Sequence, residues 1–366
     1  MELRSCRSEE RADAIRLARQ VFKDNMGEQF PVLFGEANIG RMFIAVENGT
    51  VVSMVNHHTT PVRIGDAEIL VASVGAVCTD PAFRGQKIAS RLLRLAEAKM
   101  REEGVHVIVI SGEGGIYTEF GSGFAGDMRE ALVPGTDLDR IGNVTLKCYE
   151  DSLFSAVERV HRGEPVRFVR RPDEFRMLIR GQTYPDTFAT YPFETILADG
   201  VIVAYAILVL GKEEPELGIK EFAGARDAIA AAFPLLLEKY GRSAIHFACA
   251  PDDRLLGFVP EACVKPIHQF ASLKIIDFAG LMERLAPYFR TLVGDRLTTC
   301  SFTTDAGDAV IRDQEESIRI VDSKELVKIV FGCAGAYPAN ASPRLAATLT
   351  RIFPVPLPWT HSINYQ

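Results

Sequence analysis

Three residues in one short turn, Arg84, Gly85 and Lys87, are of types that bind phosphate. They lie in the stretch VCTDPAFRGQKIASRLL, which predicts a strand, a turn and the start of a helix. The first amides of a helix have no intrahelical acceptor and lie at the positive end of the helix dipole, so they attract anions. Glycine lets the backbone approach an anion closely, and arginine adds a charged hydrogen bond. The predicted anion cradle consists of Arg84, Gly85 and the N–H groups of Gln86, Lys87, Ile88, Ala89 and Ser90.

The turn by itself leaves two interpretations open. Its spacing matches neither a GxxxxGK[ST] loop nor a GxGxxG loop, and a strand–Arg–Gly–helix turn also occurs where it only begins a helix. Lys87 raises a second question, because its ammonium would contact the phosphate if Cβ points away from the anion. If Cβ points inward, the side chain would crowd the anion instead.

The elements that position this turn follow from the spacing of apolar residues and from turn residues. We expect a helix at 9–22, a meander with turns at 48–49 and 65–66, a helix at about 85–103, an apolar strand at 105–111, a short helix at 116–120 and a strand at 143–149. The apolar strand is typical of one buried on both faces and reached by a right-handed crossover through the preceding helix.

The same order of elements recurs further along the chain. We expect a hairpin with its turn at Asp199-Gly200, a strand at 218–222, a helix at 225–241 and a strand at 244–250. Only Phe222-Ala-Gly224-Ala stands between this strand and its helix, without an arginine–glycine pair. We interpret this part as a duplicated fold that has no ligand turn.

A third segment is expected from about residue 270. It holds predicted helices at 278–293, 323–332 and 342–352, with short strands at 297–303, 308–312 and 317–321. The final stretch, FPVPLPWTHSINYQ, carries three prolines that exclude a helix. Its apolar and aromatic residues persist to Tyr365, unlike those of a frayed terminus. We therefore predict a buried C-terminal tail.

Composition narrows the classes of protein. The 366 residues suit about two or three domains, and 41 basic against 48 acidic residues give a net charge of −7 without long charge runs. Nucleic acid is therefore not expected as a partner. The seven cysteines are scattered and never spaced as CxxC, which argues against a disulfide framework or a thiolate zinc site. With no long apolar run and no signal-like N-terminus, we expect a cytoplasmic protein without membrane contact.

Two motifs resemble those of the GNAT superfamily of acyl-CoA-dependent N-acyltransferases. Pro81, Arg84 and Ala89 match its phosphate-loop frame, whereas Lys87 stands where the family has glycine. The stretch ISGEGGIYTEFGSGFAG resembles the second family motif, in which a tyrosine precedes a Gly-x-x-Phe element. These motifs lie within residues 75–125, but the layout of the whole chain resembles the Eis-type (enhanced intracellular survival) acetyltransferases.

This resemblance implies an α/β fold, with two tandem GNAT-like mixed sheets flanked by helices and a C-terminal α+β sterol-carrier-like domain. The implied division is a catalytic acetyl-CoA-binding domain at 1–150, a degenerate GNAT-like domain at 151–268 and the sterol-carrier-like domain with the buried tail at 269–366. The implied activity is direct transfer of an acetyl group from acetyl-CoA, in a ternary complex, to a primary amine of a small molecule or a lysine. No metal is expected, and a homo-oligomer is implied.

The resemblance also assigns roles to individual residues. Backbone groups of Val77, Cys78 and Thr79 would pair with the pantetheine arm, and one of these N–H groups would polarise the thioester carbonyl. Tyr117 would be the acid for the departing thiolate. Because the pKa of a phenol is about 10 and that of a thiol about 8.5, full proton transfer would be uphill, and the tyrosine would act mainly as a hydrogen-bond donor. Gln366 would supply the base through its α-carboxylate.

Several alternatives stay open. Cys78 beside the thioester would allow a covalent acyl-enzyme, but no histidine is near it in sequence and direct transfer is favoured. His57 and His58 are adjacent on a strand, so their rings face opposite sides and a packing or surface role is favoured over a metal site. A non-catalytic acyl-CoA-binding protein is the competing hypothesis, which Lys87 favours and Tyr117 and the apolar tail oppose. Transfer of a longer acyl group is a further possibility.

Overall fold

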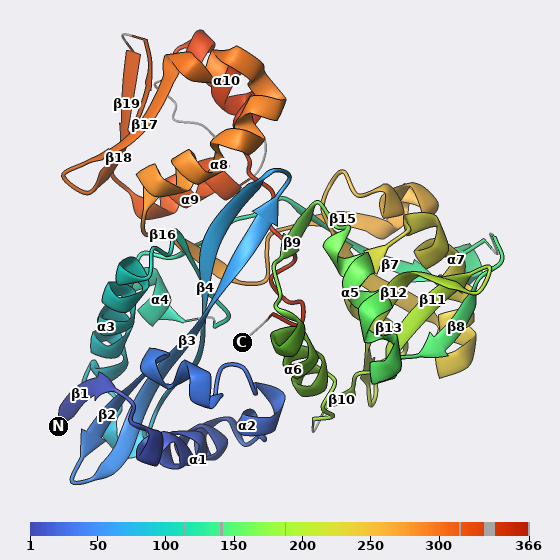
Figure 1. Ribbon diagram of the computed structural model, residues 1–366, viewed down its shortest axis with the longest axis horizontal. Helices are drawn as coiled ribbons and strands as arrows, with labels where there is room; N and C mark the ends of the chain where they lie inside the picture. The colour runs from blue at the N-terminus through green and yellow to red at the C-terminus, as the bar shows by residue number, and fades with distance from the viewer. Residues whose placement is uncertain (113, 140–141, 187, 315, 333–340, 365–366) are drawn as a thin grey trace.

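The computed structural model describes residues 1–112, 114–139, 142–186, 188–314, 316–332 and 341–364. Within these residues the chain is a mixed α/β protein with two large mixed sheets and one small sheet (Figure 1). The expected fold class of two GNAT-like sheets flanked by helices is confirmed. Short 3₁₀ helices lie at Ser8–Glu10, Glu36–Arg41, Pro81–Phe83, Gly135–Asp137, Asp151–Leu153, Arg254–Phe258, Glu261–Cys263 and Gly294–Thr299.

The first sheet is formed largely by the N-terminal part of the chain. Its strands are β1 (Glu2–Ser5), β2 (Met42–Glu47), β3 (Thr50–Ile64), β4 (Ala67–Thr79), β5 (Val107–Ile110), β6 (Gly123–Phe124), β9 (Val166–Phe168) and β16 (Ser272–Ile275). They run in the order β1-β2-β3-β4-β5-β16-β6, and β9 pairs with β3. Among them only β4 and β5 are parallel neighbours.

The helices of this unit are α1 (Arg11–Phe22), α2 (Met26–Gln29), α3 (Ile88–Glu102) and α4 (Gly115–Glu119). Asn48 and Gly49 take positive φ values of 49° and 77°, which makes the predicted tight turn between β2 and β3. The crossover helix α3 buries its apolar face on the sheet, with Leu92 and Ala96 fully buried against strand residues such as Val74 and Ile108. All four residues of β5 are buried, as its apolar run predicts.

The second sheet repeats this plan. It contains β7 (Met128–Pro134), β8 (Thr145–Cys148), β10 (Ala189–Thr190), β11 (Phe193–Ala198), β12 (Val201–Gly211), β13 (Glu216–Gly224), β14 (Ala244–Cys249) and β15 (Val264–Ile267). The order is β15-β7-β14-β13-β12-β11-β8, with β10 on β12, and β13 and β14 are parallel. Its helices are α5 (Phe154–Arg162), α6 (Pro172–Gln182) and the crossover helix α7 (Arg226–Tyr240).

The two large sheets exchange strands, which the sequence patterns did not indicate. The strand predicted at 143–149 to complete the first unit is β8, and it pairs with β11 at the edge of the second sheet. β7 also lies in the second sheet, whereas β16 returns to the first sheet and covers the free edge of β5. Apolar spacing predicts that a strand is buried but does not identify its neighbour, so this part of the prediction was wrong. The division at residues 150 and 268 stays a prediction.

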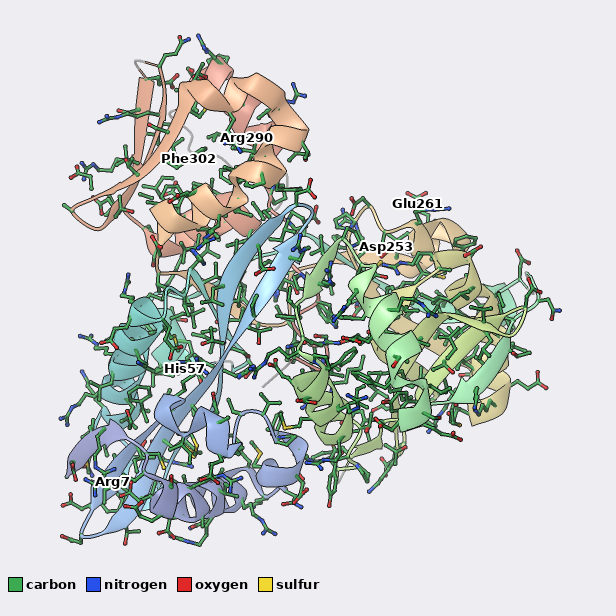
Figure 2. All side chains as sticks on the ribbon, viewed as in Figure 1. Arg7, His57, Asp253, Glu261, Arg290 and Phe302 are labelled. Carbon is green, nitrogen blue, oxygen red and sulfur yellow. The ribbon has the colours of Figure 1, made fainter. Side chains whose placement is uncertain are left out.

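The third segment packs three helices against a small sheet. Its strands are β17 (Cys300–Asp305), β18 (Asp308–Asp313) and β19 (Glu316–Ile320), and its helices are α8 (Phe278–Val293), α9 (Ser323–Phe331) and α10 (Pro343–Ile352). Phe289 and Phe331 are buried in its core, and the half-buried Phe302, labelled in Figure 2, packs against the same cluster. The same hydrophobic cluster includes Val71 of β4, so this segment and the first sheet share a core.

Residues 353–364 form a largely buried tail, as the apolar residues of this stretch predict. From Phe353 it runs between the two large sheets (Figure 1), and Ile363 is fully buried. The amide of Gln269 holds it, because Oε1 accepts from Thr360 N at 3.1 Å and Nε2 donates to Leu357 O at 3.3 Å. Among the helices described, none has the length and apolar character needed to span a membrane.

Candidate active site

β4 and β5 part from each other at the centre of the first sheet. They pair in parallel only from Val71 opposite Val107 to Val74 opposite Ile110. β5 ends at Ile110, but β4 continues to Thr79 with β3 as its strand neighbour on the other side. In the described part of the chain, Val77, Cys78 and Thr79 therefore have a strand on one edge only. This is the stretch that was predicted to pair with an extended ligand.

A β-bulge deforms β4 at the start of this opening. Met54 pairs with Cys78 but Asn56 pairs with Gly75, so β4 has an additional residue there. Ala76 takes a φ of 50°, which is uncommon for a residue other than glycine. Such bulges bend a strand and change the direction of its backbone groups. The sequence AEILVASVGAVCT reads as a regular strand, so the bulge was not foreseen.

The predicted anion turn follows β4 and is exposed. Asp80 Oδ1 accepts from Ala82 N at 2.9 Å and starts the 3₁₀ helix Pro81–Phe83. Arg84 Nε donates to Thr79 O at 3.3 Å, which holds the guanidinium over the turn. Gly85 has a φ of 79°.

Lys87 occupies the N-cap of α3 in the left-handed conformation, with φ 55° and ψ 25°. The helix therefore begins at Ile88 rather than at 85, as a left-handed residue cannot belong to a right-handed helix. The conformation explains the glycine of the family motif, because glycine adopts positive φ without strain. The backbone at Lys87 is thus in the shape that glycine would give it, and its side chain is exposed.

The first amides of α3 have no side-chain cap. Lys87 makes no side-chain capping hydrogen bond, and its carbonyl accepts from Arg91 N at 3.2 Å. The N–H groups of Ile88, Ala89 and Ser90 thus begin the helix without a side-chain cap. Gln86 precedes the helix with its side chain exposed.

Tyr117 lies at the end of β5, beside the point where the two strands part. A Cβ added at Gly112 would lie 2.7 Å from Tyr117 Cε2 and 2.8 Å from its Oη. The ring therefore lies directly against the backbone two positions after β5 ends. At the same place Ser111 Oγ donates to Val74 O at 3.3 Å. The tyrosine backbone is fixed as well, since Tyr117 O accepts from Ser122 N at 3.0 Å and from Ser122 Oγ at 2.9 Å.

The tail that leads to Gln366 is held by a buried ion pair of the second unit. Arg170 donates to both carboxylate oxygens of Glu221 at 2.7 Å, and its Nε donates to Asn364 Oδ1 at 2.7 Å. Ile363 N donates to Glu221 Oε2 at 3.2 Å. Gln366 itself, the predicted base, lies outside the described residues.

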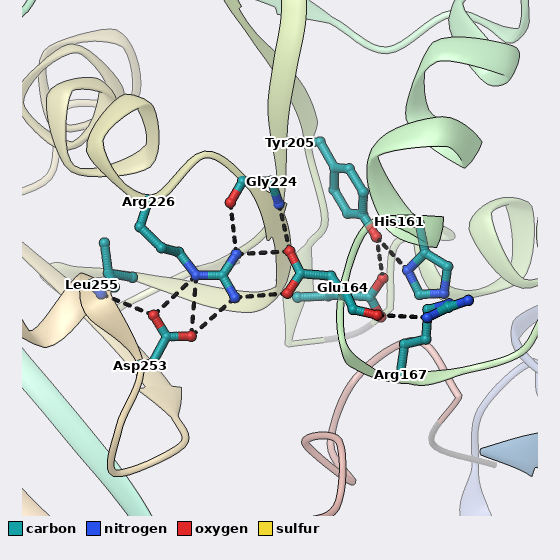
Figure 3. A network of polar contacts seen from close by, with 9 residues as sticks. His161, Glu164, Arg167, Tyr205, Gly224, Arg226, Asp253 and Leu255 are labelled. Carbon is teal, nitrogen blue, oxygen red and sulfur yellow. Dashed lines mark hydrogen bonds and ion pairs between the residues drawn. The ribbon is translucent and has the colours of Figure 1, made fainter. Parts of the chain in front are cut away.

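This ion pair is part of a larger network, of which Figure 3 shows Tyr205 and His161. Tyr205 donates its hydroxyl hydrogen to Glu221 Oε1 at 2.8 Å, and His161 Nδ1 lies 3.1 Å from the Tyr205 oxygen. Burial opposes ionisation of Glu221, but the Arg170 guanidinium outweighs it and lowers the pKa to about 2. Burial, followed by the charge of Arg170, lowers the pKa of His161 to about 3. The tail is therefore held by a charged pair beside a neutral histidine.

Two further residues have environments that decide their roles. Cys78 is 4% exposed, and burial raises the pKa of its thiol to about 12, which favours the protonated thiol at neutral pH. His57 is fully buried inside the first unit (Figure 2) and stacks on Phe43 with ring centroids 6.1 Å apart. On the opposite face, His58 Nε2 lies 3.2 Å from Glu174 Oε1 of α6. The described residues contain no cluster of three or more His, Cys, Asp or Glu side chains that would hold a metal ion.

The fold and the N-terminal sequence can now be compared with those of known proteins. Residues 2–125 match the sequence model of the acetyltransferase (GNAT) domain family. This match confirms the predicted resemblance of the N-terminal part of the chain to the GNAT acetyltransferases. A comparison of the sequence with curated proteins found no match.

Solved structures extend the likeness to the whole chain. A GCN5-related N-acetyltransferase from Anabaena variabilis has a TM-score of 0.69 at 12% identity, covering 97% of this chain and 98% of that one. One from Kribbella flavida has a TM-score of 0.66 at 14% identity, covering 98% of each chain. Eis1 from Mycobacterium abscessus has a TM-score of 0.67 at 14% identity, covering 98% of this chain and 99% of that one. The chain therefore shares the fold of these proteins over 97–98% of its length.

Proposed function

We propose that this chain is an acetyl-CoA-dependent N-acetyltransferase that moves an acetyl group to a primary amine of a small molecule or a lysine. The GNAT domain at residues 2–125 supports acyl-CoA-dependent acyl transfer in general. The observation that carries the finer proposal is the parting of β4 from β5 directly beside Tyr117. The unpaired edge of β4 at Val77–Thr79 and the hydroxyl of Tyr117 would then serve the same bound ligand.

The co-substrate would lie along the elements that form this opening. The amides of the pantetheine arm would pair with the free edge of Val77, Cys78 and Thr79. Its pyrophosphate would meet the uncapped amides at the start of α3, with Arg84 as the charged contact. Lys87 is exposed at the same N-cap, so its ammonium is available to the anion.

In the proposed reaction a neutral amine attacks the thioester carbonyl. A C–N bond forms, the C–S bond breaks and CoA leaves as a thiolate. A backbone N–H in the bulged part of β4 would stabilise the developing oxyanion. Tyr117 would donate a hydrogen bond to the leaving sulfur, and the proton lost by the amine would pass to the α-carboxylate of Gln366 through water.

Direct transfer is proposed rather than an acyl-enzyme. The buried thiol of Cys78, with its pKa raised to about 12, supports this choice. The tail contacts of Ile363 and Asn364 support a role for the C-terminal carboxylate, because they fix the chain two residues before it. We further propose a homo-oligomer in the cytoplasm, with the third segment as a sterol-carrier-like domain.

A non-catalytic acyl-CoA-binding protein is the second candidate, and Lys87 in place of glycine is the observation that favours it. Thiol release from acetyl-CoA across a panel of aminoglycosides, amino sugars, polyamines and lysine peptides separates the two. We expect amine-dependent thiol release with at least one class of acceptor. Tight acetyl-CoA binding without thiol release on any amine would support the second candidate instead.

A further inference from the structure

The second unit retains the parted strands of the first. β13 and β14 pair in parallel only from Glu216 opposite Ala244 to Gly218 opposite His246, after which β13 continues to Gly224. β13 also bulges, because Ile207 pairs with Glu221 but Leu208 pairs with Ile219. The additional residue, Lys220, follows the last parallel pair by the same two positions as Ala76 in β4. The strand geometry of the ligand opening is therefore repeated.

The phosphate turn is not repeated. Residues 80–87 separate β4 from α3, but α7 begins at Arg226, directly after Ala225. Arg226 binds Glu164 at 2.8 Å and Asp253 at 2.9 Å (Figure 3), and Glu164 Oε1 also accepts from Gly224 N at 2.7 Å. A carboxylate of the chain itself thus lies next to the helix N-terminus. A pyrophosphate would have to displace it, so the second unit is not built for CoA in the manner of the first.

A cavity of about 780 Å³ nevertheless lies at this opening. That volume is within the range of small-molecule sites. Its apolar lining includes residues of β13, of the third segment and of the tail. The residues concerned include Ile219, Phe222, Tyr288, Leu357 and Trp359.

Some of the arginines that line the cavity form ion pairs with carboxylates, and others do not. Arg170 and Arg226 have their carboxylate partners. Arg159, Arg167 and Arg254 also line the cavity, and no ion pair joins them to any residue in the described part of the chain. Burial, and then the neighbouring Arg63, lower the pKa of Arg167. An anion bound there would relieve this repulsion.

We propose that this cavity is a second ligand site, which binds an elongated, partly apolar molecule with one anionic end. The apolar body would lie between the parted strands against Leu357 and Trp359. The carboxylate or phosphate end would meet Arg159, Arg167 and Arg254. The cavity also borders Glu221, which holds Ile363 of the tail, so an occupant would contact the same segment that leads to the C-terminus.

The sequence provides its own reporter, because Trp359 is its one tryptophan and lines the cavity. Decanoate and 4′-phosphopantetheine are titrated separately while Trp359 fluorescence is followed. The two titrations distinguish a site for a fatty carboxylate from a site for a phosphate-bearing carrier. We expect a saturable change with at least one of them, and binding about tenfold weaker for decylamine and decanol. No saturable change with either anion, or equal affinity for decylamine, would overturn the proposal.

Variants locate the site. Arg159→Gln combined with Arg254→Gln removes two exposed charges and should weaken anion binding about tenfold without unfolding the protein. Arg162→Gln, on the same helix as Arg159 but outside the cavity lining, is the matched control and should bind as wild type does. Ala250→Phe should fill the cavity and abolish the change.

Arg84→Gln, in the turn of the first unit, tests whether the anions bind at that turn instead of in the cavity. Loss of the fluorescence change in Arg84→Gln but not in the Arg159/Arg254 double variant would overturn the proposal. None of these measurements involves acetyl transfer. The second site is therefore tested independently of the proposed enzyme activity.

Discussion

The ring of Tyr117 lies against the backbone of Gly112, so closely that a Cβ at position 112 would be 2.7 Å from Cε2. This contact holds the tyrosine at the point where β4 and β5 part. Any residue larger than glycine at position 112 would therefore clash with the Tyr117 ring. Backbone conformation does not require glycine there, because the φ of Gly112 is not in the left-handed region. The hydroxyl's place in the site depends on the absence of one methyl group.

Gly112→Ala should displace the Tyr117 ring without altering the anion turn. We expect kcat for acetyl transfer to fall about tenfold, because a misplaced donor loses its alignment with the leaving group, and KM for acetyl-CoA to change little. Gly115→Ala is the matched control, since a Cβ at 115 meets no atom within 4 Å. Unchanged kcat in Gly112→Ala would show that the position of the ring is irrelevant to turnover.

Lys87 has the backbone shape of a glycine and the charge of a lysine. Lys87→Asn keeps a residue that tolerates left-handed φ but removes the ammonium. We expect CoA binding by this variant to weaken about threefold at low salt, with the difference from wild type vanishing at high salt because the contact is exposed and screened. Lys87→Gly should behave as Lys87→Asn does. Tighter CoA binding in both variants would mean that the lysine crowds the phosphate.

Asn364 connects the tail to the buried Arg170. Asn364→Ala leaves one guanidinium N–H without its acceptor, at a cost of about 1–3 kcal/mol in unfolding free energy. If the tail positions the terminal carboxylate, kcat should fall severalfold while the KM for acetyl-CoA is retained. Asn143→Ala, at an exposed position, is the control. A loss of stability with unchanged kcat would limit the contact to packing.

His57 makes the stability of the protein depend on pH. Burial, and then the charge of Arg41, lower its pKa to about 3, whereas an unfolded histidine titrates near about 6.5. Between these values only the unfolded chain takes up the proton, so the unfolding free energy falls as pH drops below about 6.5. His161 adds a similar effect.

His57→Leu should remove the His57 contribution. Urea unfolding at about pH 5 and about pH 7.5 should give a pH dependence that is smaller than that of wild type by up to about 1.4 kcal/mol per pH unit. The slope should not disappear, because His161 remains. An identical pH dependence in the variant and wild type would mean that folding does not lower the pKa of His57.

The sequence allowed much of the fold to be predicted, because turn residues and apolar runs act locally, whereas the roles of the site residues stay predictions. Asn48 and Gly49 predicted their turn, and the residues of the anion turn lie at one exposed helix start. The exchange of β8 and β16 between the sheets was not predictable, since pairing partners distant in the chain leave no local pattern. The same holds for the bulge at Ala76 and for the clamp of Arg170 on Asn364, which depend on tertiary contacts. The helices at 154–162 and 172–182 were also missed.

The central claim is that the parted strands and Tyr117 form an acetyl-transfer site. The most direct measurement is the rate of thiol release from acetyl-CoA with an accepted amine, for wild type and Tyr117→Phe, with acetyl-CoA affinity measured in parallel. The account predicts that Tyr117→Phe binds acetyl-CoA about as tightly as wild type and releases thiol at least about tenfold more slowly. A wild-type rate in Tyr117→Phe would contradict it.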